Sequence, residues 1–375
     1  MSLDLASELK ARALAAGFDR AGVSSLEPLE HGPDFLRWLG RGDHAEMDYL
    51  AHRTEERLEP RKVLPGARSV LCVALQYWPL EEAGEVEGDL WPRVARYARG
   101  RDYHNLMGKR LKKLSKSLRS DFPGCETRHY VDTGPVLERE LAARAGLGVV
   151  GKNTCLLSRQ GSWFLLGEIF LTLELPPDEP LTDLCGRCTR CLEACPTDAL
   201  REPYRLDSRR CISYWSIEHR GALPEEVRHG QKDWVFGCDI CQEVCPWNIR
   251  ESPPASHPDL KLPPHRQRLD LIGLLSLDAE GYREAFIGNA MQRARLDGLK
   301  RNAANAMGNR REERYIEPLI NALQEEVEPS VRCHAAWALG QIGGEQAKTA
   351  LEGQRRREGD PTVSQEILQA LEALA

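Results

Sequence analysis

The clustering of cysteines limits how this chain can fold more than any other feature of its sequence. Eight of its twelve cysteines fall between residues 185 and 245. The first four occur as Cys185-x-x-Cys188-x-x-Cys191-x-x-x-Cys195, with Pro196 directly after them. Cysteines that crowd together in this way indicate metal binding rather than disulfide bonding. The segment therefore predicts a module built around metal centres.

The spacing is typical of bacterial ferredoxins, in which three cysteines of such a run hold one 4Fe-4S cluster and the fourth reaches a second cluster. A second set, Cys238-x-x-Cys241-x-x-x-Cys245-Pro246, lacks its first member, which Cys211 can supply. The crossover predicts two ligand sets: Cys185, Cys188, Cys191 and Cys245 for the first cluster, and Cys195, Cys211, Cys238 and Cys241 for the second.

Zinc is the competing metal, because eight cysteines could form two tetrahedral thiolate sites. Zinc sites usually use paired Cys-x-x-Cys knuckles. Zinc therefore does not account well for three cysteines in succession at this spacing followed by a Cys-Pro pair. The remaining cysteines are expected to be small core residues: Cys72, Cys125, Cys155 and Cys333.

Length and charge exclude several classes of protein. The chain has 375 residues and a formal net charge of −6. At about 150 residues per domain it should form two or three domains, and its negative charge argues against a protein that coats nucleic acid along its whole surface. It contains no apolar run of membrane-spanning length and no secretion signal, since Leu3, Leu5, Leu9 and Leu14 are spaced as in an amphipathic helix. We expect a cytoplasmic monomer with no membrane partner.

Composition divides the chain into three parts. Residues 1–175 alternate helical and strand-like stretches, with strands expected over 69–77 and 128–132 and a helix over 135–145, which predicts an α+β domain. Proline-rich stretches separate this part from the cysteine module at 176–255, and the module from an Ala-, Leu- and Arg-rich tail at 271–375. The fold class is therefore α+β, with a ferredoxin-like two-cluster domain and a helical tail.

The tail repeats itself at an interval of 32 residues. Ala303-Ala304-Asn305-Ala306-Met307-Gly308 aligns with Ala335-Ala336-Trp337-Ala338-Leu339-Gly340. Small residues at helical spacing and a fixed period are what a stacked helix-pair solenoid needs, and the tail resembles short HEAT-like repeats. A plain helical bundle is the alternative.

One segment is strongly basic in this acidic protein. Residues 91–120 contain ten Lys or Arg residues and a single acid, Asp102. Lys109, Lys112, Lys113 and Lys116 share a helical face that suits phosphate contact, although a basic helix facing solvent would have the same pattern. The tail adds further cations that could cradle an anticodon stem: Lys300, Arg301, Arg310, Arg311, Arg314, Arg332 and Arg355 to Arg357.

Several short motifs follow one another in a specific order. The run Tyr130-Val131-Asp132-Thr133-Gly134-Pro135 is followed by Gly146-Leu147-Gly148 and by Gly151-Lys152-Asn153-Thr154, then by the double-cluster cysteines and the HEAT-like tail. Over essentially its whole length the chain resembles the epoxyqueuosine reductase family. The resemblance implies a cobalamin-dependent enzyme that carries out the last step of queuosine biosynthesis, reducing the epoxide of epoxyqueuosine at the wobble position of tRNA. It also implies that the first two domains are related to those of reductive dehalogenases.

Within that resemblance, electrons pass through the two clusters to a cobalamin that attacks the epoxide, and the opened oxygen needs a proton. Asp132 is the candidate donor, because a carboxyl desolvated by the cofactor could stay protonated near neutral pH. The alternative is that Asp132 is a cap and turn residue before a helix at Pro135.

The resemblance also implies a set of cobalamin contacts: Arg57, Tyr97, Asp132, Asn153, Ser213, Glu218 and Asp239. Without it, these residues would be ordinary surface, turn, cap or core residues. Asp102-Tyr103-His104 begins like the Asp-x-His-x-x-Gly signature of histidine-ligated cobalamin, but Gly108 falls one residue late. We therefore expect no histidine ligand to cobalt.

Two other functions remain open at this point. A corrinoid reductase acting on a small molecule fits the clusters and Asp132, but leaves the tail and the basic helix unexplained. A non-catalytic electron carrier leaves the first 175 residues without a role. For the reductase we expect an external low-potential electron donor as a partner, besides tRNA.

Overall fold

The computed structural model describes residues 2–77, 92–250, 257–261, 263 and 269–374. The chain forms two compact units, each assembled from three stretches of sequence. The first unit comprises residues 1–80, 101–209 and 239–261, and the second comprises residues 81–100, 210–238 and 262–375. Of the prolines expected in linkers, Pro253, Pro254 and Pro264 lie outside the described part of the chain.

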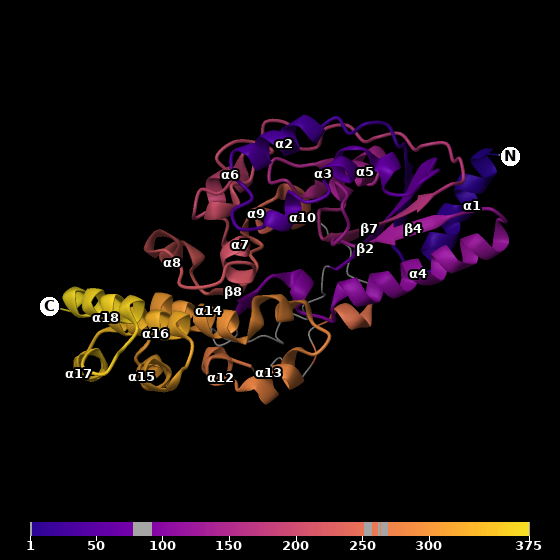
Figure 1. Ribbon diagram of the computed structural model, residues 1–375. Helices are drawn as coiled ribbons and strands as arrows, with labels where there is room; N and C mark the ends of the chain where they lie inside the picture. Colours follow the sequence, from indigo (N-terminus) through magenta and orange to yellow (C-terminus); the bar gives the residue numbers. More distant parts are fainter. Residues whose placement is uncertain (1, 78–91, 251–256, 262, 264–268, 375) are drawn as a thin grey trace. The chain divides into compact units, whose positions relative to one another are not determined.

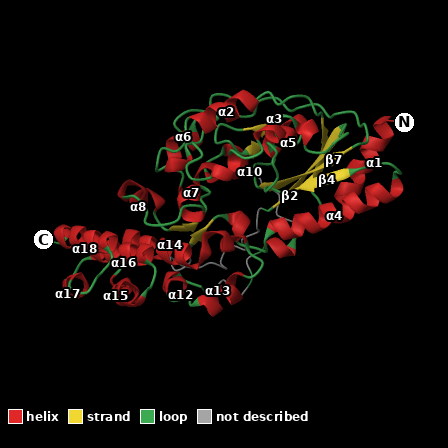
Figure 2. Ribbon diagram, in the orientation of Figure 1, coloured by secondary structure: helices red, strands yellow, loops and turns green. Residues whose placement is uncertain are grey.

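The first unit is built on an antiparallel sheet in the order β1-β2-β7-β4 (Figures 1 and 2). Its strands are β1 (Arg20–Ser24), β2 (Ser69–Gln76), β7 (Phe164–Leu171) and β4 (Thr127–Tyr130). Strand β2 is buried along its whole length, as its apolar sequence predicts. The expected strand over 69–77 is confirmed, whereas the one expected over 128–132 ends at Tyr130 and leaves Asp132 in the following loop.

Helices cover both faces of this sheet. The helices that contact it are α1 (Ser2–Ala15), α4 (Tyr103–Asp121) and α5 (Glu138–Arg144), and the same unit also contains α2 (Gly32–Gly40) and α3 (Thr54–Leu58). Helix α4 lies along one face and α5 lies over the other (Figure 1). Gly167 of β7 permits the approach of α4, because a Cβ there would lie 3.0 Å from Leu111 and 3.3 Å from Met107. Helix α1 is amphipathic and Leu9 is buried as expected, but Leu14 is 49% exposed and Ala13 is buried in its place.

The rest of the first unit is irregular and carries most of the cysteine module. Its short elements are β5 (Val149–Val150), β6 (Leu156–Leu157), α6 (Arg190–Ala194), α9 (Ile240–Glu243) and α10 (Pro246–Arg250). Asp43, which is fully buried, accepts hydrogen bonds from the guanidinium groups of Arg205 and Arg209 and so ties this segment to the amino-terminal part of the unit.

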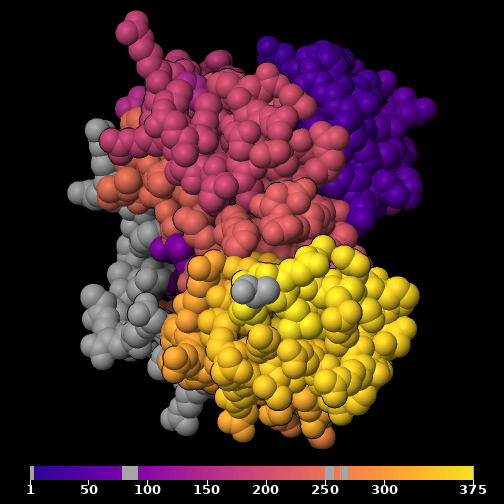
Figure 3. Space-filling model, turned by 90° about the vertical axis from the view of Figure 1, so that its left-hand side faces the viewer, coloured from indigo at the N-terminus to yellow at the C-terminus, as the bar shows by residue number. Residues whose placement is uncertain are grey.

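The second unit is mainly helical. It contains β3 (Arg93–Val94), β8 (Trp234–Phe236), α7 (Ile212–Ile217), α8 (Glu225–Gln231), α12 (Leu271–Leu275), α13 (Ala279–Phe286), α14 (Arg295–Arg310), α15 (Ile316–Glu325), α16 (Pro329–Ile342), α17 (Glu345–Arg355) and α18 (Pro361–Ala373). Strands β3 and β8 pair in parallel. Figure 3 shows the outer surface of the last helices in yellow. Among the described helices, none has both the length and the apolarity needed to cross a bilayer.

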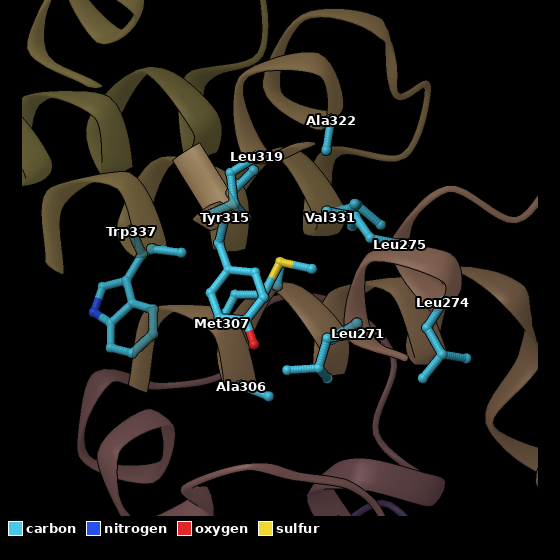
Figure 4. Close-up of a cluster of buried hydrophobic side chains, with 14 of the residues drawn as sticks. Leu271, Leu274, Leu275, Ala306, Met307, Tyr315, Leu319, Ala322, Val331 and Trp337 are labelled. Carbon is cyan, nitrogen blue, oxygen red and sulfur yellow. The ribbon is translucent and has the colours of Figure 1, made fainter. Parts of the chain in front are cut away.

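The repeat predicted for the tail places corresponding small residues on α14, α16 and α18. A Cβ on Gly308 would lie 2.5 Å from the Trp337 ring, and a Cβ on Gly340 would lie 2.9 Å from the Cβ of Ala370. Glycine is therefore required where these helices touch. Met307, Tyr315 and Leu319 fill the core between neighbouring helices (Figure 4). The stacked helix pairs confirm the predicted solenoid.

Candidate functional site

The four cysteines predicted for the first cluster all lie in the first unit. Burial, followed by the charge of Cys185 and then of Cys245, raises the pKa of Cys191 to about 11. Burial, followed by the charges of Cys185 and Cys188, also raises the pKa of Cys245. These mutual effects show that the four thiols are neighbours. Within the described residues no three His, Cys, Asp or Glu side chains surround a single-ion position. The fit to a 4Fe-4S cluster therefore rests on the all-thiol donor set.

The cysteines predicted for the second cluster are divided between the units. Cys195 and Cys241 belong to the first unit, and Cys211 and Cys238 to the second. The sulfur of Cys195 accepts a hydrogen bond from the backbone N–H of Ala199 at 3.2 Å, the kind of contact that stabilises a thiolate ligand. This ligand set stays a prediction.

The loop from Gly151 to Cys155 supports both cysteine segments of the first unit. Lys152 Nζ donates to the carbonyls of Gly186 and Cys188 at 2.8 and 3.0 Å, and Asn153 Nδ2 donates to the carbonyl of Cys241 at 3.1 Å. Cys155 was expected in the core, but a hydrogen bond with Cys241 lowers the pKa of its thiol. A lone cysteine in the sequence gives no signal of this position.

Asp132 lies two residues beyond β4 with φ at 58°, a conformation that non-glycine residues rarely adopt. It does not cap α5, which begins at Glu138 after Leu137 and has no side-chain cap. The loop is tightly held: Arg57 donates to the carbonyl of Gly134 at 3.4 Å, and a Cβ on Gly134 would lie 2.5 Å from the ring of Tyr130. The cap interpretation is therefore wrong, and the backbone strain at Asp132 is typical of functional positions.

Two neighbouring residues on the first turn of α4 bind the Asp132 carboxylate. The hydroxyl of Tyr103 donates to Oδ2 at 3.0 Å, and Nε2 of His104 lies 3.0 Å from the same oxygen. The other ring nitrogen of His104, Nδ1, lies 2.7 Å from Oδ1 of Asp102, which also caps α4 through the backbone N–H of His104. His104 is thus held between two carboxylates, and neither of its nitrogens is available for a cobalt.

The pKa values of His104 and Asp132 are shifted in opposite directions. Burial lowers the pKa of His104, but the hydrogen bonds to Asp102 and Asp132 and their charges outweigh it and raise that pKa to about 9. Burial raises the pKa of Asp132, but the hydrogen bonds from His104 and Tyr103 and the positive charges of His104 and Arg139 bring it below its usual value. Within the protein's own groups the proton therefore lies on His104 rather than on Asp132, and the expectation that a corrinoid keeps Asp132 protonated stays a prediction.

Two further carboxylates, those of Glu138 and Glu168, lie close enough to Asp132 for its charge to act on them. Burial, and then the charge of Asp132, raises the pKa of Glu138 to about 7. Glu168, on β7 and 2% exposed, has a pKa raised well above its usual value by burial and then by Glu138. Burial also raises the pKa of Cys72, which pairs with Glu168 across strands β2 and β7. The sequence offered no signal for this acidic group, because its members come from separate elements.

The other residues expected to contact cobalamin are engaged in protein contacts. Arg57 is buried rather than part of a surface ion pair, and Asp239 is 1% exposed. In the second unit, the ring of Tyr97 packs 6.2 Å from that of Phe236, and Glu218 forms an ion pair with Arg293 at 2.7 Å. Ser213 lies on α7, where its carbonyl accepts from the hydroxyl of Ser216. The cobalamin assignments stay predictions.

The predicted basic face of α4 is present. Lys109, Lys112, Lys113 and Lys116 are exposed, while Met107, Leu111 and Leu118 of the same helix are buried. Several tail cations behave differently: Lys300 and Arg301 are 8% and 1% exposed, and Arg310 and Arg332 pair with Asp233 and Glu358. The expectation that all tail cations face an RNA is wrong for these four, because the helix packing uses them.

Comparison with known proteins decides the family. A curated epoxyqueuosine reductase of Xanthomonas campestris pv. campestris is 38% identical over 352 residues, which cover 91% of this chain and 97% of the relative. The curated Escherichia coli epoxyqueuosine reductase is 37% identical and covers 90% of this chain and 89% of its own. The chain belongs to the epoxyqueuosine reductase family.

Family models agree with this assignment along the chain. The model described as epoxyqueuosine reductase QueG, DUF1730, matches residues 57–133, the 4Fe-4S double cluster binding domain matches 184–248, and HEAT repeats match 285–372. A crystal structure of epoxyqueuosine reductase with a tRNA-Tyr epoxyqueuosine-modified stem loop has a TM-score of 0.90 at 29% identity, with both chains fully covered. The predicted fold class, with its two-cluster domain and HEAT-like tail, is confirmed for this epoxyqueuosine reductase family member.

Proposed function

We propose that this protein reduces epoxyqueuosine to queuosine at the wobble position of tRNA, as an oxidoreductase that uses two 4Fe-4S clusters and cobalamin. The proposal rests on membership of the epoxyqueuosine reductase family. It is supported by the contact between Asp132 and His104, two residues that can hold and transfer a proton. These residues lie in the same unit as Cys185, Cys188, Cys191 and Cys245. The solved relative that contains a modified tRNA stem loop supports the substrate class.

The reaction requires two electrons and two protons, since the epoxide oxygen leaves as water and a carbon–carbon double bond remains. When bound, cobalamin would supply the nucleophile that attacks the strained carbon. Asp132 passes protons to the oxygen. Tyr103 and His104 orient its carboxylate, and the loop contact from Arg57 fixes its position. A positioned general acid of this kind contributes about 10²- to 10⁴-fold to the rate.

We assign the cluster ligands by the predicted crossover. Cys185, Cys188, Cys191 and Cys245 would hold one cluster, and we assign the second to Cys195, Cys211, Cys238 and Cys241. Lys152 and Asn153, through their bonds to backbone carbonyls, would keep the cysteine loops of the first unit in place. An external low-potential electron donor completes the path.

The residues of the first unit fit a cobalamin bound without a histidine ligand. Both nitrogens of His104 are occupied by carboxylates, and Arg57, Asn153 and Asp239 supply buried polar groups. We also assign cofactor contacts to Tyr97, Ser213 and Glu218 of the second unit. The lysine face of α4 would bind tRNA phosphates, and we expect the enzyme to act as a cytoplasmic monomer.

Asp132→Asn tests the proposed function. Asn keeps the size of the side chain but has no acidic proton to transfer, so anaerobic turnover of epoxyqueuosine-containing tRNA should fall by about 10²- to 10⁴-fold. Iron content and bound cobalamin should not change. Asp34→Asn, an exposed change on α2, is the matched control and should turn over normally. Loss of cobalamin in Asp132→Asn would make Asp132 a binding residue, and full activity would overturn its role.

The metal content is a second test. Protein purified without oxygen should contain iron and sulfide for two 4Fe-4S clusters and no stoichiometric zinc. Cys191→Ser should lose one cluster, because it removes a thiolate from the first set, whereas Cys125→Ser should lose none. Two zinc ions in the wild-type protein would refute the proposed electron path.

A further inference from the structure

Epoxide reduction consumes two protons, but Asp132 can hold only one at a time. The supply of the second proton is therefore a separate requirement of the site. In the structure Asp132 is joined to His104 by the 3.0 Å contact between Oδ2 and Nε2, and His104 is joined to Asp102 by the 2.7 Å contact at Nδ1. These two contacts connect Asp102, the capping residue of α4, through His104 to Asp132, the candidate proton donor.

We propose, on the basis of the proposed function, that His104 is the residue that reloads Asp132, so that one relay delivers both protons of the reduction. The first proton moves from Nε2 of His104 through Oδ2 of Asp132 to the epoxide oxygen as its first C–O bond breaks. His104 then keeps the proton on Nδ1, held by Asp102, and takes another from water at Nε2. The same path delivers it as the second C–O bond breaks and water leaves. The two electrons come from the external donor through the clusters.

The surroundings of His104 suit this task. Its side chain is 32% exposed, so it can exchange protons with water, and the side chain of Asp132 is 54% exposed. His104 faces the carboxylates of Asp102 and Asp132 and stacks on the ring of Tyr103 at 4.1 Å. The two acids stabilise the imidazolium, which is why the proton stays on His104 at neutral pH and beyond.

Glu138 is the competing proton source, and the geometry disfavours it. One of its carboxylate oxygens, Oε2, is buried without a hydrogen-bond partner, so it is cut off from water. Its hydrogen bond goes to the backbone of Asp132 and not to the carboxylate. Arg139 and His104 provide the positive charges near Asp132, and of these only His104 carries a proton that it can release at physiological pH.

The first test needs neither substrate nor cofactor turnover. Titration of the His104 ring by NMR in the full-length protein, assigned by comparison with His104→Gln, should give a pKa near 9. In Asp132→Asn this pKa should fall, because one of the two stabilising carboxylates is gone. An imidazole that titrates near 6.5 in the wild-type protein, or that Asp132→Asn leaves unchanged, would overturn the relay.

The second test is the pH dependence of single turnover on an epoxyqueuosine-modified stem loop. The wild-type rate constant should stay level to about pH 9 and fall above it. In His104→Gln, Asp132 must take its protons from water, so the rate should fall steadily from the acid side and be about 10²-fold lower than wild type at pH 8, with near-normal values at pH 5.5. His129→Gln, on the adjacent strand, should match the wild type.

The two tests distinguish proton transfer by His104 from a purely positioning role of His104. They also distinguish failure of the relay from failure of the proposed function. An equal loss in His104→Gln at every pH would mean that His104 only positions Asp132, which refutes reloading. If wild-type protein does not reduce the stem loop, the proposed function fails, while the ring titration still decides whether His104 and Asp132 share a proton.

Discussion

Helices α4 and α14 are both rich in Lys and Arg, and they use these residues in opposite ways. On α4, four lysines face outward, and in the described part of the chain no acid pairs with them. On α14, the guanidinium of Arg301 is 1% exposed and donates to the carbonyls of Trp215, His219 and Gly221, and Lys300 pairs with Glu326. A count of cations along the sequence therefore does not identify an RNA-binding surface, since packing decides which charges remain available.

Of the substitutions that test this comparison, Arg301→Met should have the largest effect, a loss of folding stability. The substitution leaves three backbone carbonyls without a donor, at about 1 to 3 kcal/mol each, so the free energy of unfolding of the second unit should fall by several kcal/mol. Denaturant unfolding of the full chain measures it. Arg311→Ala, an exposed change one residue past the end of α14, is the control and should stay within about 0.5 kcal/mol of wild type. If the two variants are equally stable, the buried hydrogen bonds of Arg301 contribute no more to folding than the exposed one of Arg311 to Gln341.

The next largest effect should come from replacing the four exposed lysines of α4 together by alanine. This variant should change tRNA binding rather than folding. The lysines are Lys109, Lys112, Lys113 and Lys116. Each lost phosphate contact flattens the slope of log affinity against log salt by about 0.7 to 0.9. Four should flatten it by up to about 3 units and weaken tRNA binding mainly at low salt. Alanine at the exposed tail residues Arg311, Arg314, Arg355 and Arg356 measures separately how much of the slope comes from the tail. An unchanged salt slope in the α4 variant would remove α4 from the RNA surface.

The sequence predicted those features that depend on spacing along the chain. The two-cluster domain, strand β2 and the 32-residue repeat all follow from spacing patterns along the sequence. The relay could not be predicted in this way, because Asp132 and His104 come from different elements, 28 residues apart, and meet only when α4 packs on the sheet. The same is true of Arg301, which donates to carbonyls 80 to 86 residues away in the sequence.

The smallest expected effect tests whether the α4 charges stay unneutralised in solution. Burial, followed by the positive charges of Arg119 and Lys112, lowers the pKa of His129 on β4. Lys112→Ala removes one of these charges, so the His129 pKa should rise toward its usual value, and NMR titration of the ring measures the shift. Lys348→Ala, on α17 in the other unit, should leave His129 unchanged. If Lys112→Ala also leaves it unchanged, counter-ions or an acid already neutralise the face, and the salt-dependent binding expected of α4 loses its physical basis.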